Sequence, residues 1–175
     1  MTDKKQQLIQ TALHLFYTKG AGQVGINEII STSGVAKKTL YAYFASKDDL
    51  ILACLRERHD VFMAWLCDEL EGANDIKSTY FQLFSALDKW FNCKVPSLAQ
   101  FRGCFFINTA AEFQEYNPDI TAYCAYHKNQ VKALLNRHLQ GGSQQVLERL
   151  FTLSEGAIVS AFMLKNSDIA KSFLR

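Results

Sequence analysis

Two lysines, a threonine and two tyrosines crowd residues 37–43, and this stretch carries the clearest chemistry in the sequence. A lysine ammonium can donate hydrogen bonds to the O6 and N7 atoms of guanine in the DNA major groove. Lys37, Lys38 and Thr39 open the stretch, so a helix whose N-terminal end faces the groove would bring them to base edges. These residue types favour a DNA-reading helix. The alternative is a solvated helix face with two core tyrosines.

A pair of short helices would position this stretch. Isoleucines recur at helical spacing in residues 26–33, and Gly34 supplies the left-handed residue that ends a helix. Leu40 and Phe44 stand four positions apart, so residues 37–44 are expected to form a second helix with these two side chains inward. Short helices joined at a steep angle by a Gly-containing turn make a helix-turn-helix, whose second helix can lie in the major groove. The sequence therefore predicts DNA binding.

Helical periodicity extends over almost the whole chain, and no segment reads as a credible strand or repeat. The expected class is all-α, with a three-helix DNA-binding head in residues 1–47 and a helical-bundle domain in residues 48–175. The remaining helices are expected at residues 4–19, 46–71, 75–91, 118–140 and 143–165, with a segment at residues 97–116 after a break at Pro96 and a short turn at 168–174.

The charges are distributed unevenly between these two parts. The chain of 175 residues has a net charge of +2. Residues 1–47 hold six lysines against Asp3 and Glu28, which gives +4, and residues 48–175 hold 13 basic and 15 acidic residues, which gives −2. The basic excess surrounds the helix-turn-helix, where contact with phosphate needs it.

Composition and the five cysteines narrow the class of protein further. Hydrophobic residues make up 49% and charged residues 21%, as in ordinary globular proteins, and the apolar runs are too short to span a bilayer. The N-terminus leads into an amphipathic helix rather than an apolar signal segment. The cysteines are odd in number and lack a CxxC pattern, which favours reduced thiols. A cytoplasmic protein is expected.

The stretch Thr39-Leu40-Tyr41-Ala42-Tyr43-Phe44-Ala45-Ser46-Lys47-Asp48-Asp49-Leu50 resembles the TetR family of bacterial transcriptional regulators (TetR/AcrR-type). The likeness reaches back through Gly34-Val35-Ala36-Lys37 to the first helix, and Gly-Val, Thr-Leu-Tyr, Tyr-Phe and Ser-Lys fall at the family's spacing. Residues 102–112 and 153–157 also look like family segments. Two positions depart from the pattern, because Gly25 stands where Thr or Ser is usual and Ala42 where His is common.

The resemblance implies an all-helical homodimer. Its N-terminal head would bind a palindromic operator in double-stranded DNA, and its C-terminal domain would dimerise and bind a small inducer that releases the DNA. Most members repress transcription, so a repressor is expected. The predicted DNA-binding residues are Lys37, Lys38, Thr39, Tyr41, Tyr43 and Lys47. Tyr41 carries over as a thymine-methyl contact and Tyr43 as a phosphate donor, while Lys47 is expected to pair with the DNA backbone.

Aromatic side chains are abundant beyond the head, which favours a small apolar or aromatic inducer in the C-terminal domain. The predicted ligand-binding residues are Trp65, Phe84, Phe101, Cys104, Phe105, Asn108 and Glu112. The alternative for these aromatics is that they fill a core. The residues predicted for dimerisation form a stripe on the last long helix, namely Ala157, Ile158, Ala161, Phe162 and Lys165. The alternative for this stripe is packing within its own chain.

Cys104 adjoins Arg102, and a nearby cation can lower a thiol pKa and make it sensitive to oxidants or electrophiles. A redox-responsive regulator on the same DNA-binding frame is therefore the alternative function. Cys124 and His127 stand at i and i+3 on one helix face, but two ligands are too few to predict a metal site. No nucleophile–base set, Gly-rich phosphate loop or paired carboxylate motif appears. Neither a cofactor nor an enzymatic activity is therefore predicted.

Overall fold

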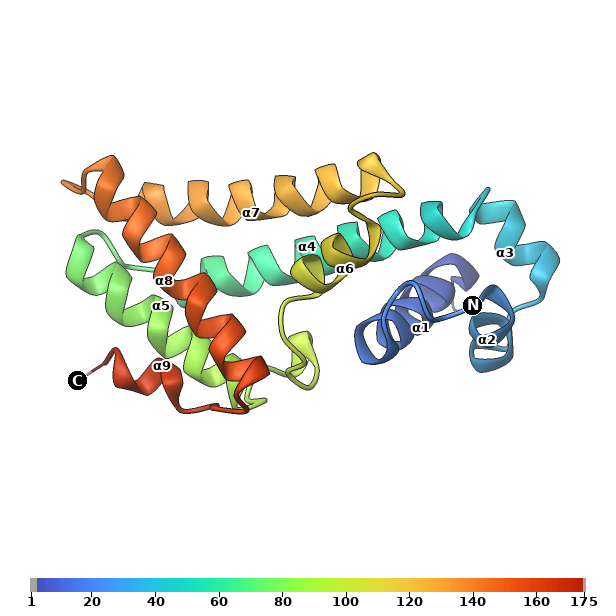
Figure 1. Cartoon of the computed structure of the whole chain (residues 1–175), viewed down its shortest axis with the longest axis horizontal. Helices are drawn as coiled ribbons and strands as arrows, with labels where there is room; N and C mark the ends of the chain where they lie inside the picture. Colours follow the sequence, from blue (N-terminus) through green and yellow to red (C-terminus); the bar gives the residue numbers. More distant parts are fainter. Residues whose placement is uncertain (1–2, 175) are drawn as a thin grey trace. The chain divides into compact units, whose positions relative to one another are not determined.

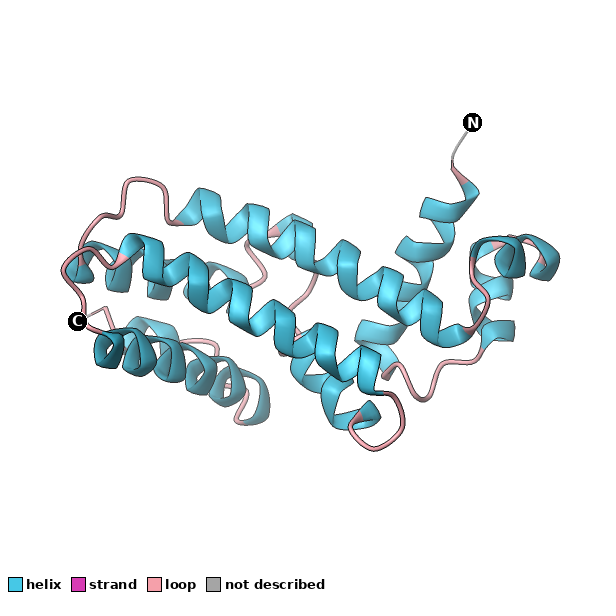
Figure 2. Ribbon diagram, turned by 90° about the horizontal axis from the view of Figure 1, so that it is seen from above, coloured by secondary structure: helices cyan, strands magenta, loops and turns pink. Residues whose placement is uncertain are grey.

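The computed structural model describes residues 3–174, and all of the regular secondary structure within that range is helical (Figure 2). The all-α prediction is confirmed. The helices, labelled in Figure 1, are α1 Lys4–Lys19, α2 Ile26–Ser33, α3 Lys37–Tyr43, α4 Lys47–Glu69, α5 Ile76–Phe91, the 3-10 turn η1 Pro96–Leu98, α6 Phe105–Phe113, α7 Pro118–His138, α8 Gln144–Met163 and α9 Ile169–Ser172.

Local chemistry fixes several of these helix ends where the sequence predicted them. Asp3 caps α1, because its carboxylate accepts a hydrogen bond from the backbone N–H of Lys5. Gly20 ends α1 at a φ of 94°, and its N–H donates to the carbonyl of Phe16. The Ser143 side chain caps α8 through the N–H of Val146. These side-chain and glycine caps satisfy backbone groups that a helix end leaves without partners.

The segment of residues 97–116 that follows the break at Pro96 is partly helical. After η1 the chain is irregular until Phe105, where α6 begins. Ala99 adopts a φ of 57° and Gly103 a φ of 81°, and residues in this left-handed region interrupt a right-handed helix. The α-helix of this segment is therefore confined to α6.

The chain divides into two compact units. The first contains the described residues up to Asp60 together with Phe105–Tyr126, and the second contains Val61–Cys104 and the described residues from His127 onward. Helices α4 and α7 thus contribute their N-terminal parts to the first unit and their C-terminal parts to the second. The domain boundary expected between residues 47 and 48 stays a prediction.

The first unit is built around α1, which packs on α2 and α3. These three helices are the blue segments of Figure 1. Leu8, Phe16, Ile29 and Leu40 are almost completely buried there. Each fully buried aliphatic or aromatic side chain contributes about 1.5–3 kcal/mol relative to exposure, so this small core holds the three short helices together.

The second unit packs α5 against α8 and α9. An aromatic cluster lies in its interior, where the ring of Phe62 lies 5.3 Å from the rings of both Trp90 and His127. Trp65 joins the same cluster, 5.2 Å from Phe62. Within residues 3–174, no helix combines the length and the hydropathy that crossing a membrane requires.

Gly34 and Gly25 flank α2 and offer a matched test of backbone strain. A Cβ at either position meets no other atom within 4 Å, but φ is 68° at Gly34 and −89° at Gly25. We expect Gly34→Ala to lower the free energy of unfolding by about 1–2 kcal/mol, because a side chain is strained in the left-handed region. Gly25→Ser should leave stability unchanged or raise it slightly, since Ser is a good N-cap. Urea denaturation followed by circular dichroism measures both changes, and equal effects would contradict the explanation.

Candidate nucleic-acid interface

The turn between α2 and α3 has the geometry that the sequence predicted. Gly34 adopts the left-handed conformation, and its N–H donates to the carbonyl of Ile30 at 2.9 Å. Val35 follows and is buried. The N–H of Val35 donates to the Oγ of Ser33, which is buried as well. The turn is therefore held by hydrogen bonds and by an apolar contact, and it sets the direction in which α3 leaves.

Helix α3 has one buried and one exposed face. Leu40 is fully buried, and Phe44, directly after the helix, is 4% exposed. Tyr41 and Tyr43 are 46% and 45% exposed, and are therefore surface rather than core residues. Lys37 and Lys38 are exposed as well. The face of α3 that is not buried thus presents two cations and two phenol rings.

Thr39 and Lys47 are less accessible than the other predicted DNA-binding residues, and each is half-buried. The Nζ atom of Lys47 donates a hydrogen bond to the carbonyl of Gly22 at 3.2 Å. Burial lowers the pKa of Lys47 below its ordinary value, although the nearby carboxylates of Asp48 and Glu112 act in the opposite direction. Lys47 therefore has a structural contact within the head, and its ammonium retains further N–H donors for a phosphate.

The residues predicted to bind a ligand are distributed over both units, with Trp65, Phe84, Phe101 and Cys104 in the second unit and Phe105, Asn108 and Glu112 in the first. Trp65 is buried in the aromatic cluster, and Phe101 packs on Trp90 with the ring centroids 5.0 Å apart. Phe84 stacks on Phe173 at 4.6 Å, whereas Phe105 packs against Tyr17 at 6.0 Å in the other unit. Trp65, Phe84 and Phe105 are buried and Phe101 is half-buried, so a ligand role for these aromatics stays a prediction.

Glu112 and Asn108 belong to α6 in the first unit. The side chain of Glu112 is engaged by backbone groups in the loop between α1 and α2, because its carboxylate accepts hydrogen bonds from the N–H groups of Ala21 and Gly22. Asn108 is half-buried. The carboxylate of Glu112 therefore joins α6 to the loop between α1 and α2, and its ligand role stays a prediction.

Two buried polar atoms stand out in the aromatic cluster of the second unit. The indole nitrogens Nε1 of Trp65 and Trp90 have no hydrogen-bond partner, although both side chains are buried. Their ring centroids lie 6.1 Å apart. A buried donor without an acceptor is uncommon and indicates a site that an acceptor atom could occupy. These are the two tryptophans of the chain.

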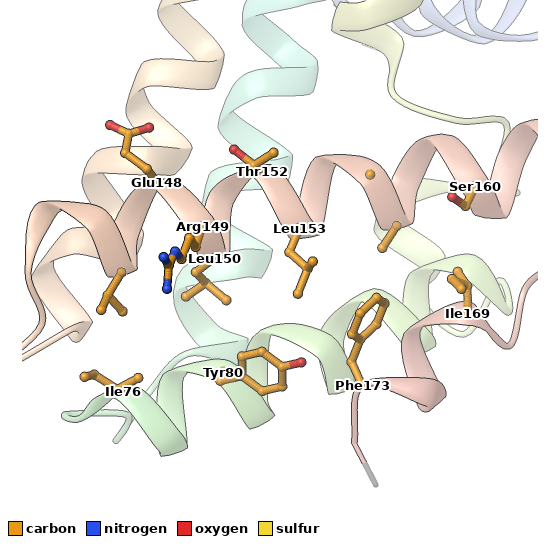
Figure 3. Close-up of a pocket in the computed structure, with 13 residues that line it drawn as sticks. Ile76, Tyr80, Glu148, Arg149, Leu150, Thr152, Leu153, Ser160, Ile169 and Phe173 are labelled. Atoms are coloured by element: carbon orange, nitrogen blue, oxygen red, sulfur yellow. The ribbon is translucent and has the colours of Figure 1, made fainter.

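An apolar groove of about 840 Å³ lies between α5, α8 and α9 (Figure 3). Leu150 and Leu153 of α8 point towards Tyr80 and Phe173 across it, as Figure 3 shows. Gly156 belongs to the same lining, and a Cβ there would meet nothing within 4 Å. The residues predicted from the sequence for ligand binding do not line this groove.

The stripe predicted for dimerisation is largely buried within the single chain. Ala157, Ile158 and Ala161 are buried, while Phe162 and Lys165 are exposed. Phe162 covers Gly103, where a Cβ would lie 3.0 Å from the ring. Large apolar side chains exposed on and directly after α8 are Leu153, Val159, Phe162, Met163 and Leu164. An apolar surface for a partner is therefore present, but most of the named stripe faces inward.

Sequence reasoning missed the cation that pairs with Cys104. Lys128 of α7 is hydrogen-bonded to the Cys104 thiol and, at 2.6 Å, to the carboxylate of Glu155 on α8. Burial alone would lower the pKa of Lys128, but the charges of Cys104 and Glu155 outweigh burial and raise it. Lys128 is therefore a protonated partner beside a buried thiol. The three residues are far apart in the sequence, so no local pattern could have indicated the cluster.

Cys54 is a buried thiol of the first unit. Burial raises the pKa of the Cys54 thiol, and its Sγ donates to the carbonyl of Ile9. That thiol is an unreactive core group. Among residues 3–174, no three His, Cys, Asp or Glu side chains gather as a metal ion would require, Cys124 and His127 included.

Known proteins resemble the N-terminal part of this chain in sequence. The family model for bacterial regulatory proteins of the tetR family matches residues 8–54. An uncharacterized HTH-type transcriptional regulator of Bacillus subtilis, YerO, is 40% identical over 53 residues, which is 30% of this chain and 18% of YerO. The chain matches about a fifth of the length of YerO and of the B. subtilis regulator YuxN. The HTH-type transcriptional repressor NemR of Escherichia coli is 23% identical over 143 residues, covering 81% of this chain and 70% of NemR.

Solved structures extend the likeness of the fold to nearly the whole chain. A TetR-family transcriptional regulator from Streptomyces coelicolor superposes with a TM-score of 0.79 at 24% identity, covering 98% of this chain and 90% of that one. The reduced form of E. coli NemR gives a TM-score of 0.80 at 22% identity, covering 98% of this chain and 94% of NemR. The match of residues 8–54 and the helix-turn-helix geometry thus identify the N-terminal part of the chain as a DNA-binding segment of the tetR family of bacterial regulatory proteins, and the solved structures show that nearly the whole chain shares the fold of such regulators.

Proposed function

We propose that this regulator is a sequence-specific DNA-binding repressor that acts as a dimer on a palindromic operator in the bacterial cytoplasm. The observation that carries the proposal is the two-sided α3. Its inner face is anchored by Leu40, and its outer face presents Lys37, Lys38, Tyr41 and Tyr43 to solvent. Lysines and tyrosines on an exposed recognition helix can read base edges and contact phosphates.

A dimer explains how so short a helix can read a specific site. One α3 covers only a few base pairs, whereas two copies about 34–36 Å apart enter successive major grooves on one side of the duplex. Any ligand that changes this separation lowers the affinity for DNA, provided that it binds the two states of the protein with different affinities. A small apolar or aromatic inducer is proposed to act in this way.

The aromatic cluster of the second unit supports an inducer of that chemistry. Trp65 and Trp90 supply flat apolar surfaces and two buried indole N–H groups without acceptors. An aromatic molecule that carries a carbonyl or ether oxygen would match both features, but it must displace packed side chains to reach the two N–H groups, because both rings are buried. Ligand sites of this kind combine apolar walls with a few placed polar groups.

Selection from random duplex DNA at fixed salt tests the DNA-binding function, and we expect an inverted repeat to be enriched. In the double variant Lys37→Ala/Lys38→Ala, affinity for the enriched duplex should fall at least about tenfold, since a good base contact contributes about 1–3 kcal/mol. Removal of each lysine that contacts a phosphate should also reduce the slope of log K against log salt concentration by about 0.9. Fluorescence anisotropy at several salt concentrations measures both quantities.

The matched control is Lys77→Ala/Lys94→Ala, which removes the same charge from exposed positions in the second unit. It should bind the enriched duplex as the unchanged protein does. Equal losses in the two double variants would show that net charge alone governs the affinity. Failure of the unchanged protein to enrich any sequence would exclude a sequence-specific regulator.

The exposed side of α8 is proposed as the dimer surface. Val159 and Met163 are exposed there, Met163 by 68%, and Gly156 lies on the same side of the helix with open space around it. A glycine between apolar side chains lets a second helix approach closely. The predicted residues Phe162 and Lys165 are exposed near the same end of the helix.

We expect Gly156→Lys to convert the dimer to a monomer, because it places a long cation where the second helix would pack. The substitution should not harm the single chain, since a helix-interior Gly costs about 0.8–1.0 kcal/mol relative to Ala. Gly156→Ala, which adds only a methyl group, is the control and should remain dimeric. Light scattering distinguishes one chain of 19.8 kDa from two. A dimer that persists in Gly156→Lys would place the interface elsewhere.

The Lys128–Cys104 pair favours a second candidate function, a regulator that responds to oxidants. A cysteine thiolate can attack hydrogen peroxide to give a sulfenic acid, and the hydroxide that leaves becomes water after protonation. Cys104 is buried, so only a small oxidant has ready access. Resemblance to NemR, whose solved structure is described as the reduced form, is compatible with this candidate.

We expect peroxide to weaken DNA binding by the unchanged protein and Cys104→Ser to abolish that response while still binding DNA. Lys128→Gln should slow the reaction, because the thiol loses its cation. Cys67→Ser removes an exposed thiol and serves as the control. Anisotropy after peroxide treatment and mass spectrometry of the modified cysteine report the result. Identical responses in Cys104→Ser and the unchanged protein would eliminate this candidate.

A further inference from the structure

The loop between α1 and α2 is held by a carboxylate from α6. In Glu112, Oε2 accepts a hydrogen bond from the N–H of Gly22 at 2.5 Å, and Oε1 accepts one from the N–H of Ala21 at 3.3 Å. On the other side of the same residue, Lys47 donates to the carbonyl of Gly22 at 3.2 Å. The Gly22 backbone is therefore bracketed by an anion and a cation from two other helices.

Two glycines leave the space that this carboxylate occupies. A Cβ at Gly22 would lie 2.8 Å from Oε2 of Glu112, and a Cβ at Gly20 would lie 3.2 Å from Oε1. Real Cβ atoms essentially never approach another atom as closely as 2.8 Å. The Glu112 carboxylate therefore fits against the loop because Gly20 and Gly22 have no side chains.

A second contact ties the same region to the start of α4. The amide Nδ2 of Asn117 donates to Oδ2 of Asp48 at 2.8 Å. Gly22 precedes the helix-turn-helix of residues 26–43 and Asp48 follows it. The corner between α6 and α7, defined here as residues 112–117, thus holds both chain ends of the DNA-reading motif.

We infer that Glu112 is a positioning residue for DNA recognition, which sets the orientation of α2 and α3 by holding the Gly22 peptide. The inference rests on the proposed DNA-binding function and adds a control point to it. Hydrogen bonds from backbone N–H groups to a carboxylate are charge-assisted and stronger than neutral ones. Small displacements of this loop alter where α3 meets the groove, and binding specificity is sensitive to such displacements.

The test compares Glu112→Ala with Glu115→Ala. Glu115 is an exposed carboxylate on the same corner, so the two variants make the same change in charge. Amide hydrogen exchange, followed by NMR, should accelerate at Ala21 and Gly22 in Glu112→Ala and not in Glu115→Ala. Affinity for the duplex enriched by the unchanged protein should fall about tenfold in Glu112→Ala, while Glu115→Ala binds normally. Glu112→Gln keeps one acceptor oxygen, so its affinity for the duplex should lie between those of Glu112→Ala and Glu115→Ala.

Gly22→Ala approaches the same contact from the other partner. Its Cβ should displace the carboxylate, so this variant is expected to reproduce the loss of DNA affinity seen in Glu112→Ala. In the double variant Gly22→Ala/Glu112→Ala the clash between the new Cβ and the carboxylate disappears. The losses of DNA affinity caused by the two single substitutions should therefore not add. Additive losses would mean that Gly22 and Glu112 act independently, which would overturn the inference.

The remaining outcomes separate the inference from the proposed function. If the unchanged protein binds its enriched duplex and Glu112→Ala binds equally well, Glu112 does not position the head. Unchanged amide exchange at Ala21 and Gly22 in Glu112→Ala would overturn the inference as well. If the unchanged protein selects no DNA sequence, the proposed function fails, whatever the exchange rates show.

Discussion

The recognition helix depends on tertiary packing, because α3 spans only Lys37–Tyr43. A helix this short is not stable alone in water, where helices of fewer than about 12–15 residues are marginal. Burial of Leu40 and Phe44 supplies the stability that the helix lacks, and Gly34 allows the turn that brings these side chains inward. The same packing leaves Tyr41 and Tyr43 outside. Stability and DNA reading are thus assigned to opposite faces of one short helix.

Local patterns predicted the parts of the molecule that local forces determine. The spacing of isoleucines, the glycine after Ser33 and the positions of Leu40 and Phe44 gave the bounds of α2 and α3 almost to the residue. The exposed Lys37 and Lys38 followed from the same amphipathic pattern. Caps such as Asp3 are also visible in the sequence, because the donor lies two residues from the acceptor.

Contacts between distant residues were beyond these patterns. Glu112 was expected near a ligand because it shares a segment with aromatics. In the structure its carboxylate accepts hydrogen bonds from the N–H groups of Ala21 and Gly22, which precede it in the chain by 91 and 90 positions. Lys128 was not singled out, since only the fold brings it to Cys104. The irregular backbone between η1 and α6 was not predicted, because the left-handed conformation at Ala99 is not evident from an alanine. The residues named for ligand binding stay a prediction, since aromatics at helical spacing also fill cores.

Helix α6 carries one of the features that sequence reasoning did not find, because Glu112 is its penultimate residue. Its carboxylate accepts hydrogen bonds from the loop that precedes α2. A hydrogen bond to a charged group contributes about 1.5–3 kcal/mol, which is the size of a typical allosteric coupling of about 1–3 kcal/mol. Loss of the Glu112 contact would therefore change the free energy of the head by an amount that matters for binding, without rearrangement of the hydrophobic core that holds α3.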